Sequence, residues 1–259
     1  MRARSESLGR KALMRTRRAV GAVLVSPALG GVIGRVLRDC IPHRGLKIST
    51  SDPLIAPETN AALLFRAYES AEFRFMQRYL PADADVVELG GSIGVMTCLI
   101  RKKLRSNFQL VTVEADHRLI ELLHRNVVAN GCDKNTTIVN AAIAVTDKDE
   151  VAFATGASSL SGSVGAGVST MGVRATSLSQ LVKQQGFDRF NIICDIEGAE
   201  WELWRLDRDA LQRADSIILE THDHPDYGTW KDLVAEIEAT PGFYVVDRYS
   251  AVVVVKTST

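Results

Sequence analysis

From residue 84 onward the sequence alternates short apolar runs with helical patterns, and this alternation restricts the fold more than any other feature. The runs lie at residues 85–89, 109–114, 137–143, 191–195 and 216–220. Strands separated by helices pair in parallel, which predicts an α/β fold with a mostly parallel sheet and helices on both faces. Two final runs, 243–246 and 251–256, are joined by a short polar turn, so a hairpin with an antiparallel last strand is expected.

The segments before residue 84 have a different character. The 259 residues can form one α/β domain with a small addition. We predict three parts: a basic N-terminal extension at residues 1–50 that includes helical sequence, a linker and leading helix at 51–83, and the main domain at 84–259. Pro53 and Pro57 oppose regular structure across residues 44–60, and a helix is expected over residues 60–79.

Charge is distributed unevenly, although the whole chain has 31 basic and 31 acidic residues. Residues 1–50 contain 11 of the basic residues and two of the acidic ones, so the remainder is acidic. An acidic body argues against nucleic acid as a partner, because phosphate binding needs positive charge. The separation predicts that the basic arm and the acidic body have different roles.

The apolar run from Ala19 to Gly34 in this arm allows three interpretations. It is shorter than the ~20 apolar residues that span a bilayer, and Pro27 interrupts it. A basic start before an apolar run is typical of a signal peptide, although Arg35 and Arg38 follow where small residues would mark a cleavage site. The second interpretation is an amphipathic helix through which residues 1–45 contact an anionic membrane. The third is a solvated or self-packing extension.

A glycine-rich turn follows the first strand of the main domain. The sequence Glu88-Leu-Gly-Gly-Ser-Ile-Gly94 leads from that strand into a helix. Glycines let the backbone approach a ligand, and a helix N-terminus offers free N–H groups. A dinucleotide fingerprint has glycine at the position of Ser92, so the match to that motif is incomplete. The carboxylate of Glu88 faces either a ligand or the amides of the loop.

Glu114 ends the second strand, roughly 20 residues beyond the glycines. A carboxylate in this place can accept both ribose hydroxyls of an adenosine, in a site for NAD or for S-adenosylmethionine. The alternative is a solvated charge at the end of a strand. The spacing predicts that Glu114 belongs to a nucleoside-binding site.

Acidic and imidazole side chains follow the fourth and fifth strands. The fourth ends in Cys194-Asp-Ile-Glu-Gly-Ala-Glu200, and the fifth in Glu220-Thr-His-Asp-His224. Ligands of open α/β sheets bind beyond the carboxyl ends of the strands, where these residues are expected to meet Glu88. Such groups serve general-base catalysis or bind a hard metal ion. The alternative is that the acids cap or pair locally and the histidines are solvated, whereas Trp201 and Trp204 are expected to pack in the core.

Together these motifs resemble the FkbM-type methyltransferases over roughly residues 62–256. The resemblance rests on five segments, in this order: Val86–Gly94, Glu114, Asn140–Ala144, Thr176-Ser-Leu and Asp195-Ile-Glu-Gly-Ala-Glu200. It implies a class I methyltransferase (Rossmann-like) fold with a seven-stranded sheet and S-adenosylmethionine as the methyl donor. It also implies O-methylation of a hydroxyl on a sugar or natural product.

The resemblance also implies roles for individual residues. The cofactor residues would be Glu88, Gly90, Gly91, Ser92 and Gly94 at the methionine end, Glu114 at the ribose, Ala141 or Ala142 near adenine, and Asp195 between cofactor and acceptor. For the proton of the acceptor hydroxyl, Asp195, His222 and His224 are the candidate bases. Glu197, Glu220, Ser158 and Ser159 are the candidate acceptor-binding residues, the two serines from a small-residue loop that starts at Gly156.

The sequence also departs from the family pattern. Glu88 replaces the usual aspartate, Gly91-Ser92 replaces Ala-Asn, and Ala115 replaces a proline. Ile193 occupies a position that is commonly lysine, and Ser179 ends a pattern that usually ends in aspartate. These last two departures concern the acceptor side.

We therefore predict an S-adenosylmethionine-dependent methyltransferase that acts on a small-molecule or glycan acceptor. Two alternatives remain: an NAD-linked oxidoreductase and a catalytically silent domain recruited through its basic arm. The sequence neither requires nor excludes a divalent metal, and it leaves the oligomeric state open. Four scattered cysteines without a C-x-x-C pair favour the cytoplasm, with membrane association if the arm binds lipid.

Overall fold

The computed structural model describes residues 26–155, 163–164 and 169–258. The chain divides into two compact units, with the boundary between Tyr68 and Glu69. Each unit has its own buried residues, and the candidate site residues from Glu88 onward belong to the second.

In the first unit, two helices accompany a β-hairpin. Its elements are α2 (Pro27–Leu37), β1 (Cys40–His43), β2 (Leu46–Ser49) and α3 (Pro57–Leu64). The hairpin turns at Arg44 and Gly45, both with positive φ (47° and 84°), as a two-residue turn between twisted strands requires. Residues 44–60, expected as a linker, therefore contain a strand and the start of a helix.

The helix expected over residues 60–79 is two helices, so that prediction was wrong. α3 ends at Leu64, and α4 runs from Ser70 to Tyr79 in the second unit. Arg66 and Glu69 take the left-handed conformation (φ 59° and 43°), which breaks the helical path. Neither glycine nor proline separates the two helices, so the sequence carries no ordinary signal for this break.

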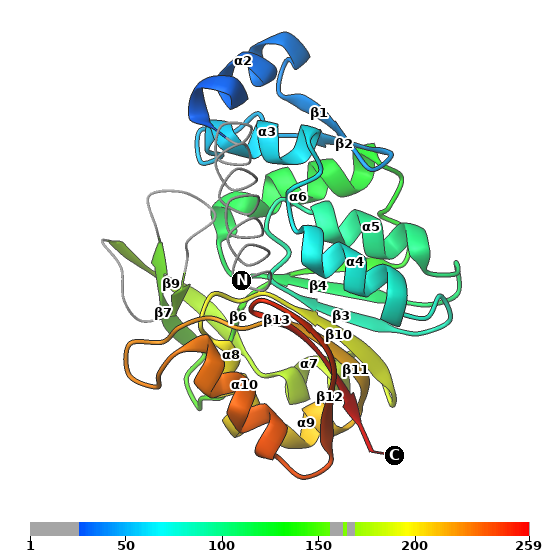
Figure 1. Ribbon diagram of the computed structural model, residues 1–259, viewed down its shortest axis with the longest axis vertical. Coiled ribbons are helices and arrows are strands. Elements are labelled where there is room, and N and C mark those ends of the chain that lie inside the picture. Colours follow the sequence, from blue (N-terminus) through cyan, green and yellow to red (C-terminus); the bar gives the residue numbers. More distant parts are fainter. Residues whose placement is uncertain (1–25, 156–162, 165–168, 259) are drawn as a thin grey trace, which may run out of the picture. The chain divides into compact units, whose positions relative to one another are not determined.

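The second unit is built on a seven-stranded sheet (Figure 1). Its strands, in spatial order, are β12 (Phe243–Tyr249), β13 (Val252–Thr257), β11 (Ala214–Glu220), β10 (Phe190–Cys194), β3 (Val86–Leu89), β4 (Leu110–Glu114) and β5 (Thr136–Asn140). β13 is antiparallel to both β11 and β12, and the other neighbouring pairs are parallel. This order with one reversed, inserted strand is the class I methyltransferase (Rossmann-like) fold, as predicted.

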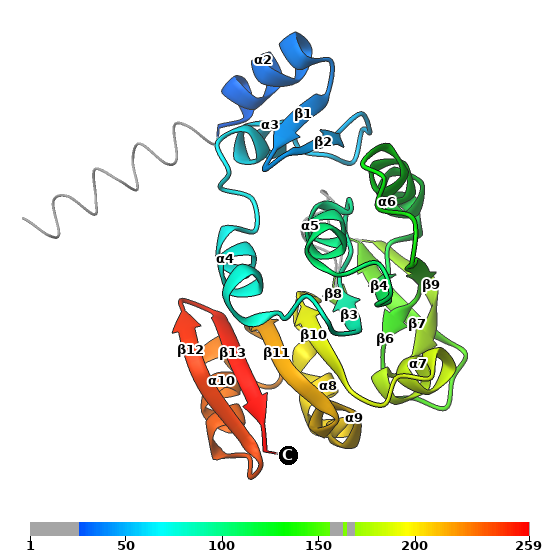
Figure 2. The same ribbon diagram turned by 90° about the vertical axis from the view of Figure 1, so that its right-hand side faces the viewer.

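Helices cover both faces of this sheet, as Figure 2 shows. One face carries α4, α5 (Val95–Lys103) and α6 (His117–Ala129). The other carries α7 (Leu178–Gln185), α8 (Glu200–Leu206), α9 (Arg208–Gln212) and α10 (Trp230–Ala239), which share a large apolar core with the sheet.

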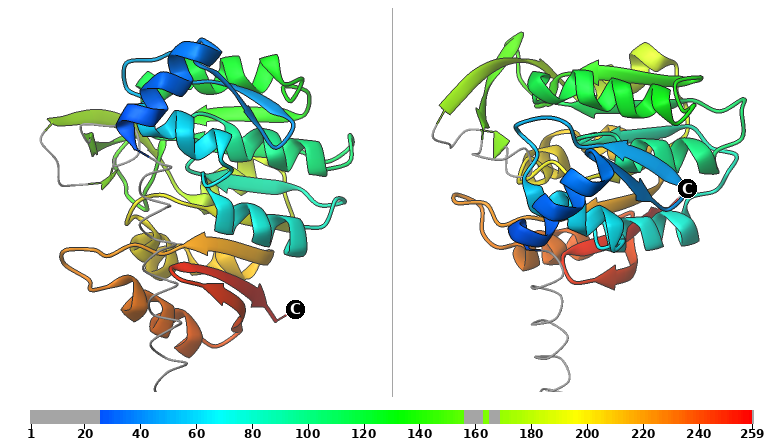
Figure 3. Two further views of the ribbon diagram at one scale, coloured as in Figure 1. Left: turned by 45° about the horizontal axis from the view of Figure 1, so that its top comes forward. Right: turned by 90° about the horizontal axis from the view of Figure 1, so that it is seen from above.

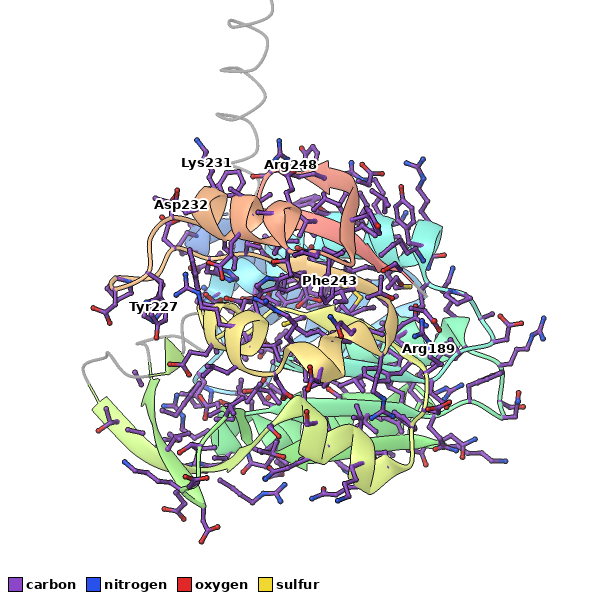
Figure 4. All side chains as sticks on the ribbon, turned by 90° about the horizontal axis from the view of Figure 1, so that it is seen from below. Arg189, Tyr227, Lys231, Asp232, Phe243 and Arg248 are labelled. Carbon is purple, nitrogen blue, oxygen red and sulfur yellow. The ribbon has the colours of Figure 1, made fainter. Side chains whose placement is uncertain are left out.

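Trp201 and Trp204 are core residues, as predicted, and each is 1% exposed. The ring of Trp204 packs on Phe243 with centroids 4.7 Å apart. Figure 4 shows Phe243 on the inner side of β12, whereas Lys231 and Arg248 point outward. Burying a large aromatic side chain is among the stronger sources of stability in a domain of this size.

The third predicted strand, residues 137–143, is not continuous. β5 ends at Asn140, and β6 (Ala142–Ile143) pairs instead with β9 (Ser169–Thr176) in a separate four-stranded sheet. That sheet also contains β7 (Glu150–Thr155) and β8 (Ser163–Val164). The β7–β9 pair projects from the seven-stranded sheet (Figure 3). Ser158 and Ser159, predicted to bind the acceptor, lie outside the described residues.

Helix caps explain several element boundaries. The side chain of Asp116 accepts from the amide of Arg118 at the start of α6, and Gly131 with φ of 64° follows its end. Ser177 and Gln180 form a capping box at the start of α7.

Within the described part of the chain, no helix is long and apolar enough to cross a membrane. Residues 1–25 fall outside this part, so the membrane contact stays a prediction.

Candidate active site

The carboxyl ends of β3, β4, β10 and β11 meet at one edge of the seven-stranded sheet. The predicted site residues at this edge are Glu88, Glu114, Asp195, Glu197, Glu220 and His222, each at or just beyond the end of one of these strands. In open α/β sheets, this edge is where ligands bind.

The glycine turn after β3 leaves no space for side chains at its first two positions. A Cβ at Gly90 (φ 92°) would lie 1.8 Å from the carbonyl oxygen of Asp195, and one at Gly91 would lie 2.4 Å from Oγ1 of Thr112. Gly94 (φ 83°) then starts α5. The turn is therefore packed against the end of β10, which joins the two halves of the site.

Glu114 holds the glycine turn in place. Its Oε2 accepts from the amide of Ser92 and its Oε1 from the amide of Asp116, each at 2.7 Å. Burial raises the pKa of Glu114, and these two amides oppose that shift. Each carboxylate oxygen has a second lone pair, so Glu114 can still accept ribose hydroxyls. That ribose contact stays a prediction.

Glu88 is a buried carboxyl with one unsatisfied oxygen. The residue is 1% exposed, and its Oε2 accepts from Oγ1 of Thr97 at 2.6 Å. Its Oε1 has no hydrogen-bond partner among the described residues. Burial raises the pKa of Glu88 to about 7, although hydrogen bonds from Thr97 and Thr112 lower it. A buried acceptor without a donor is costly, so this oxygen is suited to a cationic or N–H ligand.

Ala141 and Ala142 follow β5 and are both buried (1% exposed). The amide of Ala141 donates to the carbonyl of Glu114 at 3.1 Å, and Nδ2 of Asn140 donates to the same carbonyl at 2.8 Å. Sequence reasoning did not identify this bracing role of Asn140.

The segment after β10 forms a tight loop around Glu200. Glu197 (φ 52°) and Gly198 (φ 104°) take left-handed or related conformations. The fully buried carboxylate of Glu200 accepts from the amide of Ile196 at 2.9 Å and from that of Gly198 at 2.8 Å. Glu200 thereby fixes the loop that presents Asp195 and Glu197.

His222, beyond the end of β11, lies among three of these carboxyl groups. Its Nδ1 is 3.0 Å from Oε1 of Glu200, and its Nε2 is 3.7 Å from Oδ1 of Asp195 and 3.6 Å from Oε2 of Glu197. Burial lowers the pKa of His222, but the bond to Glu200 and the charges of the three carboxylates raise it to about 10. At neutral pH the ring is therefore an imidazolium, which disfavours His222 as a general base.

Asp195 is placed between the glycine turn and His222. Burial raises the pKa of Asp195 to about 7, His222 lowers it, and Glu197 and Glu200 raise it further. Its Oδ1 is shielded from solvent and has no hydrogen-bond partner in the part of the chain that is described. A carboxylate with a pKa near 7 can take up a proton in general-base catalysis.

A second carboxyl pair borders the site. Burial, then the charge of Asp195, then a hydrogen bond with Glu72 raise the pKa of Glu220 to about 8. Glu72 belongs to α4 and is buried with Phe75 and Met76 on the same face. Sequence reasoning missed Glu72, because no local pattern in α4 indicates that this acid faces Glu220 of β11.

His224 occupies a separate position in the loop between β11 and α10. Its ring stacks on Tyr227 with centroids 4.3 Å apart, and its Nδ1 accepts from the amide of Asp226 at 3.1 Å. Figure 4 shows Tyr227 in this loop, away from the body of the sheet. The structure thus brings His222 together with the carboxyl groups and gives His224 other contacts.

A pocket of about 390 Å³ opens beside His222. Its walls are Glu197, Glu220, Thr221, His222, Asp223, Trp230 and Ala251. Most of these side chains can donate or accept hydrogen bonds, and Trp230 adds an aromatic surface. This composition suits a polar acceptor with several hydroxyl groups.

Ser179, where the resembling family has aspartate, contacts an acid from elsewhere in the chain. The backbone amide of Ser179 donates to Oδ2 of Asp207 at 3.0 Å, and its hydroxyl donates to Oδ1 of the same residue. Asp207 is 5% exposed and follows α8. A carboxylate therefore lies beside this position, although it comes from a different element.

Comparisons with known proteins give similarities of fold. No protein-family model matches the chain, and no curated protein matches its sequence. Among solved structures, a methyltransferase from Geobacter sulfurreducens is 13% identical, with a TM-score of 0.47 over 88% of this chain and 96% of that one. The METTL16 MTase domain is 14% identical, with a TM-score of 0.47 over 90% and 80%.

An O-methyltransferase from Bacillus cereus, solved in complex with SAH, is similar over 73% of this chain and 79% of its own. It is 12% identical, with a TM-score of 0.46. A shared fold does not define a function.

Proposed function

We propose that this protein is an S-adenosylmethionine-dependent methyltransferase that O-methylates a hydroxyl of a sugar or natural product. The observation that carries this proposal is the pair of buried carboxyls, Glu88 and Glu114, on either side of the glycine turn. Their charges interact with one another, so the site selects against further negative charge.

This charge distribution favours S-adenosylmethionine over NAD as the cofactor. The pyrophosphate of a dinucleotide is anionic and would be repelled by Glu88. S-adenosylmethionine carries a sulfonium and an ammonium group, both positive. The unsatisfied Oε1 of Glu88 offers an acceptor for such a cation. The residues present therefore fit this cofactor better than NAD.

The cofactor would supply a methyl group on a positively charged sulfur, and the protein has to hold the acceptor oxygen and remove its proton. Asp195 is the best placed base, because its pKa of about 7 matches neutral conditions. The imidazolium of His222, 3.7 Å from Oδ1 of Asp195, stabilises the carboxylate form before the proton is taken up. Positioning of the acceptor contributes much of the remaining rate.

The acceptor would occupy the pocket beside His222. Glu197, Glu220 and Thr221 offer hydrogen bonds to hydroxyls, and Trp230 offers a flat apolar surface of the kind that sugar rings stack on. Glu220, with a pKa of about 8, is a proton donor at neutral pH.

Thermal unfolding with three ligands in parallel tests the cofactor: S-adenosylhomocysteine, S-adenosylmethionine and NAD. A ligand at about 100 times its dissociation constant adds roughly 2.7 kcal/mol to the free energy of unfolding. We expect a shift of several degrees with the two adenosyl-sulfur ligands and none with NAD. A shift with NAD alone would favour the oxidoreductase, and no shift with any ligand would favour a silent domain.

A further inference from the structure

The helix α2 in the first unit has two faces of different character. Its inner face packs against α3 and β1 (Figure 2), and Gly30, Ile33 and Gly34 are buried there. A Cβ at Gly30 would lie 1.9 Å from the carbonyl oxygen of Pro57, so α2 and the start of α3 touch at the backbone. The side chains on the opposite side of α2 therefore point away from the core of this unit.

Ala28, Val32 and Val36 form an apolar stripe along this outer side. They are spaced at i, i+4 and i+8, which aligns them on one helix face. Val32 is 52% exposed, Val36 is 73% exposed, and Ala28 is exposed as well. Arg35 lies beside the stripe and is the only polar side chain among the 11 residues of α2. A helix face in water is normally rich in polar residues, so this face suits a partner with an apolar surface.

The charge of the surrounding chain indicates what kind of partner fits. Residues 1–38 contain nine basic side chains and one acid. Arg35 lies on α2 and Arg38 is its C-cap, whereas the other seven precede the N-cap of α2 at Ser26. Positive charge and an apolar helix face are thus joined within one short stretch of chain. An anionic phospholipid surface offers the complement to both, because it has phosphate groups and acyl chains.

We propose that α2 docks on an anionic phospholipid membrane through Ala28, Val32, Arg35 and Val36. At 11 residues the helix is about 16 Å long, which is shorter than the ~30 Å hydrocarbon core of a bilayer. Because its inner face is packed on α3, α2 lies along the membrane surface, with the two valines among the upper parts of the acyl chains. The guanidinium of Arg35 reaches the phosphates while its methylene groups lie beside the valines.

Two other kinds of partner fit this face less well. Nucleic acid binds mainly through its phosphates, which leaves the two exposed valines without a partner. Protein interfaces draw most of their binding energy from a few aromatic and arginine side chains in fitted pockets, and α2 has no aromatic residue. A lipid surface needs no fitted pocket, because apolar insertion and charge attraction are both without direction.

Co-sedimentation of the full chain with lipid vesicles tests this surface. We expect binding to vesicles that contain phosphatidylglycerol, and at least ~10-fold weaker binding to vesicles of phosphatidylcholine alone. Salt at about 1 M, where the screening length is ~3 Å, should weaken the binding to the anionic vesicles. Failure of the unchanged protein to bind phosphatidylglycerol vesicles overturns the proposal.

Substitutions on α2 test whether this helix is the part that binds. Val32→Glu and Val36→Glu each place a charge among the acyl chains and should weaken vesicle binding at least ~10-fold. Val128→Glu, at a valine of α6 that is 47% exposed, is the matched control and should bind like the unchanged protein. All three valines are exposed, so the unfolding temperature should not fall, and a folding failure would be recognised by this measurement. Equal vesicle binding by Val36→Glu and Val128→Glu overturns the proposal.

A charge variant and the oligomeric state complete the test. Arg35→Gln should weaken binding about 5-fold, which is the effect of one basic side chain near an anionic surface. Arg125→Gln, at an exposed position of α6, should have no effect. A second copy of the chain is the other occupant that an apolar face can have. A dimer that Val36→Glu dissociates in sedimentation velocity would assign the face to self-association and overturn the lipid proposal. None of these readouts depends on methyl transfer, so the proposed activity and the membrane contact can fail separately.

Discussion

The backbone amide of Ser92 donates to Oε2 of Glu114 across 2.7 Å, which ties the glycine turn after β3 to the end of β4. Ser92 has a positive φ of 46°, so the turn adopts a conformation that a serine takes only when its surroundings hold it. The carboxylate that is proposed to bind the ribose is therefore the same group that keeps the glycine turn in shape.

Glu114→Gln should destabilise the protein as well as weaken cofactor binding. Both carboxylate oxygens accept backbone amides, and a glutamine must turn its NH₂ group toward one of them. A buried donor left facing another donor costs about 1–3 kcal/mol. Thermal unfolding with and without S-adenosylhomocysteine measures both effects. Glu121→Gln, at an exposed position of α6, is the matched control, and equal unfolding temperatures for the two variants would contradict the prediction.

Comparison of Gly90→Ala with Gly131→Ala distinguishes the stability lost to a steric collision from the stability lost to a left-handed backbone conformation. Both glycines have positive φ, at 92° and 64°. A Cβ at Gly131 meets nothing within 4 Å in the described structure, so only the left-handed conformation is penalised, by about 1–2 kcal/mol. A Cβ at Gly90 also collides with the carbonyl of Asp195, which adds at least ~1–3 kcal/mol. Urea unfolding of the two variants measures the difference, and similar losses would refute the close packing of the turn against β10.

Glu88 should make stability fall as pH rises. Burial raises the pKa of this carboxyl from 4.5 to about 7. Below pH 4.5 both the folded and unfolded states carry the proton, so Glu88 contributes no pH dependence. Between pH 4.5 and 7 only the folded state carries it, and the free energy of unfolding decreases by up to ~1.4 kcal/mol per pH unit. Above pH 7 the decrease levels off.

Glu88→Gln removes this titration and keeps an oxygen that can accept from Thr97. The stability of the unchanged protein relative to this variant should therefore drop between pH 4.5 and 7, by on the order of 3 kcal/mol in total. Urea unfolding at several pH values measures it. A difference between the two proteins that does not vary with pH would show that Glu88 is ionised throughout.

Asp195→Asn should abolish proton removal while leaving cofactor binding intact. If Asp195 is the base, the variant loses roughly 10²–10⁴-fold in kcat. The thermal shift with S-adenosylhomocysteine should be retained, because Glu88 and Glu114 are unchanged. Asp226→Asn, in the loop that carries His224, is the control for a nearby acid. Full turnover by Asp195→Asn with normal cofactor affinity would remove Asp195 from the mechanism.

Much of the second unit was predictable because each signal is local. Apolar runs, capping residues such as Ser177 and the turn before Val252 mark the ends of strands and helices directly. The parallel sheet and the reversed strand β13 follow from the presence or absence of helices between those runs. The same rule predicts that Glu88, Asp195 and His222 lie at one edge of the sheet.

What the sequence did not reveal depends on contacts between distant segments. The left-handed Arg66 and Glu69 split the expected helix without a glycine or proline to mark the place. Glu72 joins the site from α4, a helix that sequence reasoning treated only as a leading element. The ring of His222 contacts Glu200, whereas that of His224, two residues further along, stacks on Tyr227. No local sequence pattern predicts this difference.

The position of β13 between β11 and β12 also determines when the sheet can be completed during synthesis. β12 leaves the ribosome before β13, yet within the described strands it joins the sheet through β13 alone. Until β13 is made, β11 is an open edge and β12 is an unpaired apolar segment, both of which are prone to aggregate. A variant truncated before residue 252 should therefore aggregate far more readily than the full chain.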